Sequence, residues 1–332
     1  MTAQPQPEPE ARLVSRPGLE SLLASVENSC LDPRAGIFGP DSITWTLSRE
    51  SAVFLGAGRA ALLQLAHPWV AAALAEHSSL LSRPVARFHN TFRIVFTMIF
   101  GSLRQATAAA RHLHTLHTRI QGELPEPVAG WPSGTHYAAN EIAALRWVYA
   151  TLVDSAVLAC EWILPLTPSD REAYYRESHT MAALFGLPSS ALAANWTSFQ
   201  DYTRSMTESA ELGVSPAARS MAHAILSGSG SWIHPPHWYR AMTTAWLPER
   251  FREEFDLTCS AADQRLVERA RRWFPRVYRI LPADLRFVGP YLEAQTRLEG
   301  RAPGWLTRRS NLFWLGEPAL PFARQGPPHA GH

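Results

Sequence analysis

The sequence predicts an all-α protein, built as a single globular helical domain without a significant sheet. Three observations support this prediction. Apolar residues recur at the three- and four-residue spacing of amphipathic helices along most of the chain, no segment shows the strict alternation of a half-buried strand, and no internal repeat is visible. The chain has 332 residues, which is enough to bury a sizeable core.

Composition divides the chain into three parts. Residues 1–17 are rich in proline and polar side chains and predict a disordered arm. Residues 18–300 form the helical domain, and residues 301–332 form a tail rich in proline and glycine. Helices are expected, in chain order, at 51–79, 87–100, 103–121, 138–163, 169–185, 196–208, 216–227, 236–246, 261–279 and 284–298.

Capping and breaking residues justify several of these boundaries. Pro68 should kink the first helix, because proline lacks a backbone N–H and its ring clashes with the preceding turn. Gly122 should end the third helix, and Pro165 should end the fourth. Ser169 should cap the next helix, with Glu172 completing a capping box.

His117 is the polar exception on an apolar helix face. With a helix turning about 100° per residue, one stripe of the helix at 103–121 comprises positions 103, 106, 109, 110, 113, 116, 117 and 120. Every other member is apolar, whereas His114 lies at the edge of the stripe and His112 on the opposite flank. A buried imidazole needs a partner. His117 is therefore either a hydrogen-bonded core residue or a ligand.

Arg87 and Thr91 lie one turn apart on the preceding helix, on the same face as Ile94 and Met98. A guanidinium and a hydroxyl at the mouth of an apolar face can hydrogen-bond a small ligand such as dioxygen, or a cofactor carboxylate. The alternative is that Arg87 pairs with a buried acid, for which Asp154 is the obvious candidate. Both interpretations stay open on the residues alone.

Two polar residues of the first long helix have simpler explanations. His67 precedes Pro68, and its ring nitrogen can satisfy a backbone group near the kink, so a structural role is expected. Glu76, near the end of the same helix, is expected to be a solvated carboxylate unless it faces a pocket, where it could act as a base.

Composition and absent motifs exclude several function classes. The net charge of +2 argues against nucleic-acid binding. The chain contains no lysine, which excludes a P-loop and Schiff-base chemistry. ExxH, HExxH and GxSxG are absent, and no GxGxxG follows a predicted strand, which argues against di-iron bundles, zinc proteases, α/β-hydrolases and dinucleotide enzymes.

Cysteine usage and hydropathy bear on the compartment. The three cysteines are far apart, which argues against a disulfide framework and a thiolate metal site. No secretory signal is visible near the start, and the apolar runs are either too short or interrupted by charges. We therefore expect a cytoplasmic protein without a transmembrane segment. An all-helical protein with imidazoles on an apolar wall is a suitable setting for haem.

Five segments together resemble the MpaB-type oxygenase family, which shares the catalytic domain of bacterial latex-clearing rubber oxygenases. These segments are GRAALLQLAHPWVAAALAEHS, the RxxxT step that leads to FG, HTRIQG, LRWVYATLVDS and EAYYRESHTMAALFGLP. The resemblance covers roughly residues 35–300. It implies an all-helical fold with a globin-like core and, as in the rubber enzymes, haem b held by one proximal histidine.

The resemblance assigns roles to particular residues. His117, in HTRIQG, would be the iron ligand, and His114 would be the next candidate. Arg87 and Thr91 would form the distal polar pair near bound oxygen, and Glu76 would match the pocket carboxylate of the family. Rubber oxygenases carry a lysine immediately before the threonine that can cap the iron, whereas this chain has Asn90, which is a poor iron ligand.

The sequence thus predicts a haem b-dependent oxygenase that uses dioxygen to oxidise an apolar, olefinic or lipid-like small molecule. An electron donor would be a possible further partner. The lack of an export signal argues against solid rubber as the substrate. Two other hypotheses remain: a haem-binding or redox-sensing protein without turnover, and a metal-free helical binding protein for an apolar ligand.

Overall fold

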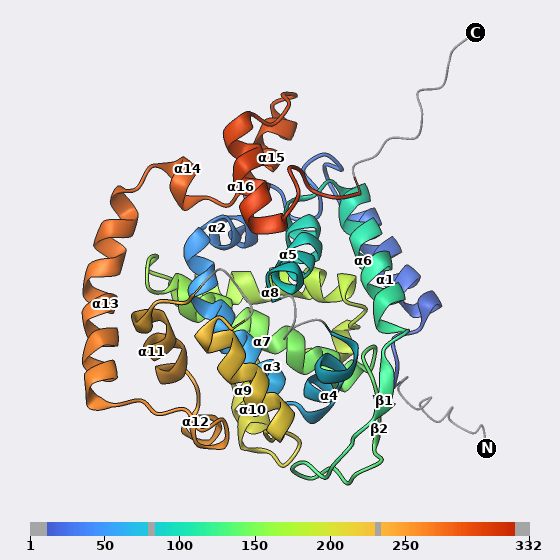
Figure 1. The fold of residues 1–332 in the computed structure, drawn as a ribbon. Coiled ribbons are helices and arrows are strands. Elements are labelled where there is room, and N and C mark those ends of the chain that lie inside the picture. Colours follow the sequence, from blue (N-terminus) through green and yellow to red (C-terminus); the bar gives the residue numbers. More distant parts are fainter. Residues whose placement is uncertain (1–11, 79–83, 230–233, 323–332) are drawn as a thin grey trace, which may run out of the picture.

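The structure, a computed structural model, describes residues 12–78, 84–229 and 234–322. Within these ranges it contains sixteen α-helices, two short 3₁₀ helices and one two-stranded sheet, which confirms the all-α prediction (Figure 1). The elements are α1 Arg16–Ser29, α2 Ile43–Ser48, η1 Ser51–Gly56, α3 Ala57–Leu65, α4 Pro68–His77, α5 Pro84–Phe100, α6 Leu103–His117, β1 Gln121–Glu123, β2 His136–Ala138, α7 Ile142–Cys160, α8 Pro168–Leu184, η2 Ser189–Ala191, α9 Trp196–Glu208, α10 Pro216–Ser227, α11 His237–Ala245, α12 Glu249–Glu254, α13 Ala261–Ile280, α14 Ala283–Arg286, α15 Gly289–Leu298 and α16 Trp305–Leu315.

Helix α7 lies at the centre of the fold, where η1, α2, α3 and α8 pack around it (Figure 1). Its backbone is approached closely, since a Cβ added at Gly56 would lie 2.3 Å from the carbonyl oxygen of Ser155. By length and composition α7 could also cross a membrane, but more than half of it is buried inside the fold. The same length and apolarity are expected of the core helix of a large helical domain.

Helices α5 and α6 pack against each other and carry the predicted site. Ser102 caps α6 in a capping box with Gln105, which fixes the direction in which the chain leaves α5. The predicted helix at 103–121 is wrong at its end, because α6 stops at His117 and the next residues form β1. Strand β1 pairs antiparallel with β2, so the backbone there bonds to a strand rather than to a further helical turn.

The predicted boundaries need corrections at both ends of the domain. Residues 12–15 were expected in a disordered arm, yet Val14 is buried and its N–H donates to the carbonyl oxygen of Asn140 at 2.9 Å. Residues 1–11 lie outside the described part. In the expected tail, α16 is a helix, and the buried Glu293 accepts hydrogen bonds from Asn311 (2.6 Å) and from the N–H of Leu320 (3.0 Å).

Helix starts were predicted with mixed success. Helices α9 and α10 match the expected ranges at 196–208 and 216–227. Pro68 begins α4 instead of kinking one long helix, because proline is well suited to the first helical position. The cap of α8 is Thr167 with Asp170 rather than Ser169 with Glu172.

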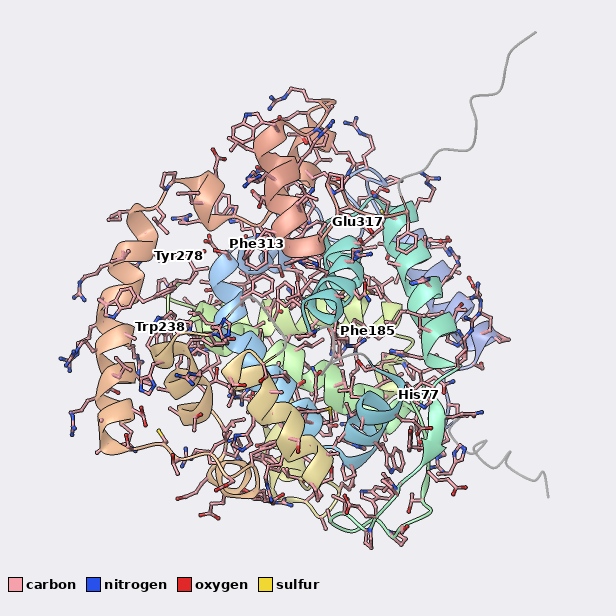
Figure 2. All side chains as sticks on the ribbon, viewed as in Figure 1. His77, Phe185, Trp238, Tyr278, Phe313 and Glu317 are labelled. Carbon is pink, nitrogen blue, oxygen red and sulfur yellow. The ribbon has the colours of Figure 1, made fainter. Side chains whose placement is uncertain are left out.

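Helix α13 forms one edge of the fold and packs against α11. Trp238 of α11 and Tyr278 of α13 belong to the core cluster between these two helices (Figure 2). The inner face of α13 is thus partnered.

Candidate functional site

His117 ends α6 and presents a neutral imidazole. The chain turns directly after it, with the N–H of Ile120 bonded to the carbonyl oxygen of His117 at 3.0 Å. The side chain is partly buried and makes no hydrogen bond with any described residue. Burial first, then the charges of Arg87 and His114, lower the pKa of His117 to about 4. The ring is therefore neutral at pH 7 and has a nitrogen lone pair free for a ligand.

Arg87 lies near the N-terminal end of α5, and its charge is one of those that act on His117. Its guanidinium makes no ion pair with an acid in the described part of the chain. The side chain is accessible at its surface, although burial lowers the pKa of Arg87. Many protein atoms therefore surround the guanidinium, although solvent still reaches the side chain.

Thr91 follows one turn later on α5, on the same face as Arg87. Its hydroxyl donates to the carbonyl oxygen of Arg87 at 3.0 Å. A hydroxyl also has two lone pairs, so the Thr91 oxygen can still accept a hydrogen bond. To donate a hydrogen bond to a ligand, the Thr91 hydroxyl must first break its bond to the carbonyl oxygen of Arg87.

His114, the alternative ligand, is already engaged. Its Nε2 is bonded to the carbonyl oxygen of Val14 at 3.0 Å, and Asn140 donates to the same carbonyl at 3.2 Å. These contacts tie the segment before α1 to α6 and to the start of α7. Of the two histidines, His117 is the one without a protein partner among the described residues.

Glu76 is placed at the end of α4, beside the hairpin that follows His117. Its carboxylate accepts a hydrogen bond from the buried Tyr137 at 2.7 Å and lies 3.7 Å from Nε2 of His77. The side chain is 57% exposed. A Cβ at Gly122 would lie 2.9 Å from the Glu76 carboxylate, so the carboxylate packs over β1. Tyr137 gave no signal in the sequence, because its partnership depends on the hairpin.

Asp154 pairs with Arg59, not with Arg87. The two charged groups are 2.7 Å apart, and Arg59 also donates to Ser155 at 2.9 Å. The suggestion that Arg87 merely neutralises Asp154 is therefore wrong. Arg59 was overlooked as a partner because only the packing of α3 on α7 brings the two residues together.

A wall of aromatic rings lines another face of α5, next to the one with Arg87. Phe88, Phe92 and Phe96 follow one another at the four-residue spacing of a helix, with ring centroids 4.5 and 5.7 Å apart. Phe54 lies 4.6 Å from Phe92 and stacks on Trp314 at 4.1 Å. The regular spacing of the phenylalanines was the signal in the sequence that could have predicted this wall.

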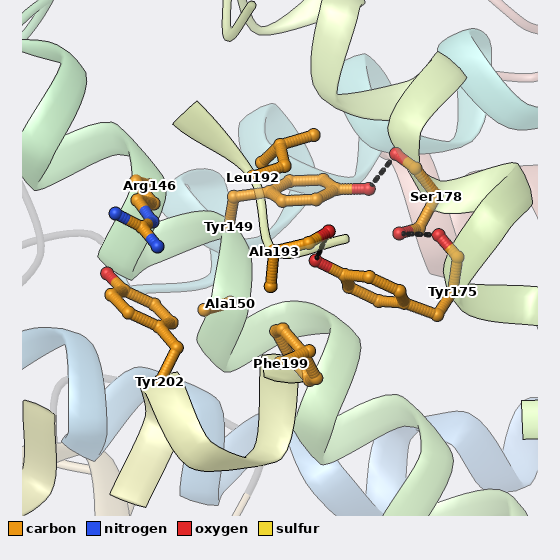
Figure 3. A pocket seen from close by; sticks show the side chains of 9 residues that line it. All are labelled: Arg146, Tyr149, Ala150, Tyr175, Ser178, Leu192, Ala193, Phe199 and Tyr202. Carbon is orange, nitrogen blue, oxygen red and sulfur yellow. Dashed lines mark hydrogen bonds between the residues drawn. The ribbon is translucent and has the colours of Figure 1, made fainter. Parts of the chain in front are cut away.

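A separate small cavity lies between α7, α8 and α9 (Figure 3). The phenol of Tyr149 donates to the carbonyl oxygen of Ser178, and that of Tyr175 donates to the carbonyl oxygen of Ala193 at 3.0 Å. The guanidinium of Arg146 lies 3.8 Å from the ring centre of Tyr202. None of the predicted site residues lines this cavity, so we regard it as part of the core packing.

The fold and these residues define an all-helical protein in which the neutral imidazole of His117 makes no hydrogen bond with a described residue and is under the influence of the Arg87 charge. The chain matches, over residues 44–276, the family described as ER-bound oxygenase mpaB/B'/rubber oxygenase, catalytic domain. It therefore belongs to this oxygenase family, as the five sequence segments predicted. No curated protein and no solved structure shows a significant match.

Proposed function

We propose that the chain is a haem b-dependent oxygenase that uses dioxygen to oxidise an apolar, olefinic or lipid-like small molecule. The oxygenase class follows from the family. The observation that carries the haem assignment is the imidazole of His117, which is kept neutral by burial and makes no hydrogen bond with a described residue. A neutral imidazole is the form that binds iron.

The donor set fits haem better than a metal held by side chains alone. Within the described ranges, no group of three or more histidines, cysteines and acids is close enough to hold a metal ion. Haem needs only one axial ligand from the protein, because the macrocycle brings four nitrogens. When bound, it would supply the capacity to bind and activate dioxygen.

The remaining residues would prepare the site for that chemistry. Arg87 has guanidinium N–H groups without an acid partner in the described part and can donate hydrogen bonds to an oxygen atom or a carboxylate. Thr91 offers a hydroxyl oxygen one turn away. Glu76, bonded to Tyr137, would take up or relay a proton. The aromatic wall on α5 would exclude water and favour an apolar substrate.

Oxygen uptake tests this proposal. The chain, expressed in the cytoplasm where we propose that it acts, is loaded with haem b and supplied with squalene as an apolar alkene probe. We expect oxygen uptake together with an oxidised product. Arg87→Met should lower the rate by roughly a hundredfold at unchanged haem content, because a donor aimed at developing charge is lost. Arg176→Met, at an exposed arginine of α8, is the matched control and should keep the rate.

The two rival functions give different results. Haem binding without uptake for any unsaturated probe would favour a haem-binding or redox-sensing protein. A chain that retains no iron would favour a metal-free binding protein for an apolar ligand.

A further inference from the structure

Helix α13 and the short helix α14 carry a stripe of exposed apolar side chains. Trp273, Val277 and Ile280 follow at helical spacing on α13, Leu281 comes directly after the helix, and Leu285 lies on α14. Ile280 is 80% exposed and Leu285 is 67% exposed. Exposed apolar residues that are scattered singly need no explanation, but five of them in one short stretch of the chain indicate a contact surface.

This stripe is not the face with which α13 holds to the fold. The inner face of the helix uses Ala270, Phe274 and Tyr278, which are buried or partly buried against α11. Trp238 of α11, for example, lies 6.0 Å from Phe274 between ring centres. Trp273 belongs partly to this packing, since its ring centre lies 6.2 Å from that of Trp238. Val277, Ile280, Leu281 and Leu285 are not members of this core cluster, so their apolar side chains are additional to it.

Exposed arginines of α13 lie beside the stripe. Arg265, Arg269, Arg271, Arg272 and Arg276 are all exposed, and none forms an ion pair with an acid in the described part of the chain. At about 100° per residue, most of them lie on the polar side of α13 next to the stripe. The whole chain has a net charge of only +2, so this helix concentrates positive charge locally.

Helix α16 repeats the pattern. Trp305, Leu306 and Phe313 are exposed, with Trp305 at 71%, and Arg308 and Arg309 are exposed beside them. Phe313 lies on α16, next to α5 (Figure 2). In Figure 1, α13 forms the left margin of the fold, α14 continues from its upper end, and α16 stands beside α15 at the top. We call the exposed apolar residues and arginines of these three helices the basic edge.

We propose that the basic edge binds the surface of an anionic lipid bilayer. Helices that lie on a membrane combine arginines with tryptophan and aliphatic side chains that enter the headgroup region. The guanidinium group bonds phosphate oxygens, and the indole ring prefers the interface between water and lipid. This inference does not depend on haem or on the proposed oxidation.

Charge favours a membrane over a second copy of the chain as the occupant. A symmetric contact between two copies would use the same surface on both, and would place arginines opposite arginines. An anionic bilayer instead offers negative charge across the whole edge. Each arginine near such a surface contributes about a fivefold increase in partition, so several together give measurable binding.

Vesicle flotation tests the proposal with the full chain. The probes are vesicles of phosphatidylcholine alone and vesicles of phosphatidylcholine mixed with phosphatidylglycerol. We expect the chain to float with the mixed vesicles and to remain unbound with phosphatidylcholine alone. Raised salt should release it, because screening weakens the attraction between surface charges.

Two variants with matched controls identify the surface. Ile280→Glu with Leu285→Glu should lose most of the binding, whereas Leu31→Glu, at a fully exposed leucine between α1 and α2, should not. Arg269→Glu with Arg276→Glu should lower the partition at least about twentyfold, since two positive charges are removed and two negative charges added. Arg176→Glu on α8 should have a much smaller effect. All changed side chains are exposed, and circular dichroism verifies that the variants fold.

Equal binding to both vesicle types, or wild-type binding by both paired variants, would overturn the proposal. Light scattering measures whether the chain instead forms a dimer through this surface. A dimer that is abolished by the Ile280 and Leu285 changes, without vesicle binding, would assign the basic edge to a second copy of the chain.

Discussion

His67 caps the N-terminus of α4 and should make the unfolding free energy of the fold depend on pH in the acid range. The residue is buried, and its Nδ1 accepts a hydrogen bond from the N–H of Trp69 at 3.3 Å, which caps the helix. Burial lowers the pKa of His67 to about 4. Only a neutral ring can accept at Nδ1, so protonation would remove the cap and leave a buried charge.

The direction of the pH effect follows from the two pKa values of His67. An unfolded histidine has a pKa of about 6.5, above the folded value of about 4, so the unfolded chain binds an extra proton between these limits. The contribution of His67 to the unfolding free energy is therefore full above pH 6.5 and is lost as the pH falls towards 4. Between pH 7.5 and pH 5, this one residue should cost about 2 kcal/mol of unfolding free energy.

Urea unfolding followed by circular dichroism at pH 7.5 and pH 5 measures this cost. His67→Asn and His67→Ser both keep an N-cap acceptor but do not titrate. On going from pH 7.5 to pH 5, the unfolding free energy of each variant should fall by about 2 kcal/mol less than that of the wild type. Their absolute stabilities will differ because each leaves a cavity of a different size, but that loss is independent of pH. Wild type and both variants with the same pH dependence would refute the reasoning.

Three further predictions concern the packing around the site. Gly56→Ala would place a Cβ 2.3 Å from the carbonyl oxygen of Ser155 and should cost at least about 3 kcal/mol in urea unfolding; an unchanged midpoint would contradict the close packing of η1 on α7. Arg59→Met should cost about 3 kcal/mol by leaving Asp154 unpaired, and adding Asp154→Asn should restore part of the loss. His114→Ala removes the bond to the carbonyl of Val14, so limited proteolysis should cut before α1 faster than in wild type, and equal cutting rates would argue against this anchor.

The sequence predicted the fold class and most helices because their apolar spacing is regular. The capping residues were harder to predict. Ser169 and Thr167 both resemble N-caps, and only the structure shows that the hydroxyl of Thr167 accepts the N–H of Asp170. Helix α16 was missed because many of its apolar side chains are exposed, so its sequence lacks a clear buried stripe.

For the candidate site, helical spacing in the sequence predicted which residues share a helix face. It did not predict which side chains pair across the fold. The position of His117 among apolar residues, and the one-turn step from Arg87 to Thr91, could be deduced from helical geometry. The partners of Asp154, His114 and Glu76 could not, because each is contributed by an element distant in sequence. The engagement of His114 by Val14 leaves His117 as the stronger ligand candidate.

We propose that His117 alone holds haem b from the protein side. The decisive measurement is titration of the purified chain with haem b, followed by the Soret band, with His117→Ala and His114→Ala measured beside the wild type. We predict saturation at one haem per chain for the wild type and for His114→Ala, and no saturable band for His117→Ala at unchanged helicity. An equal Soret band in wild type and His117→Ala would show that His117 is not the ligand.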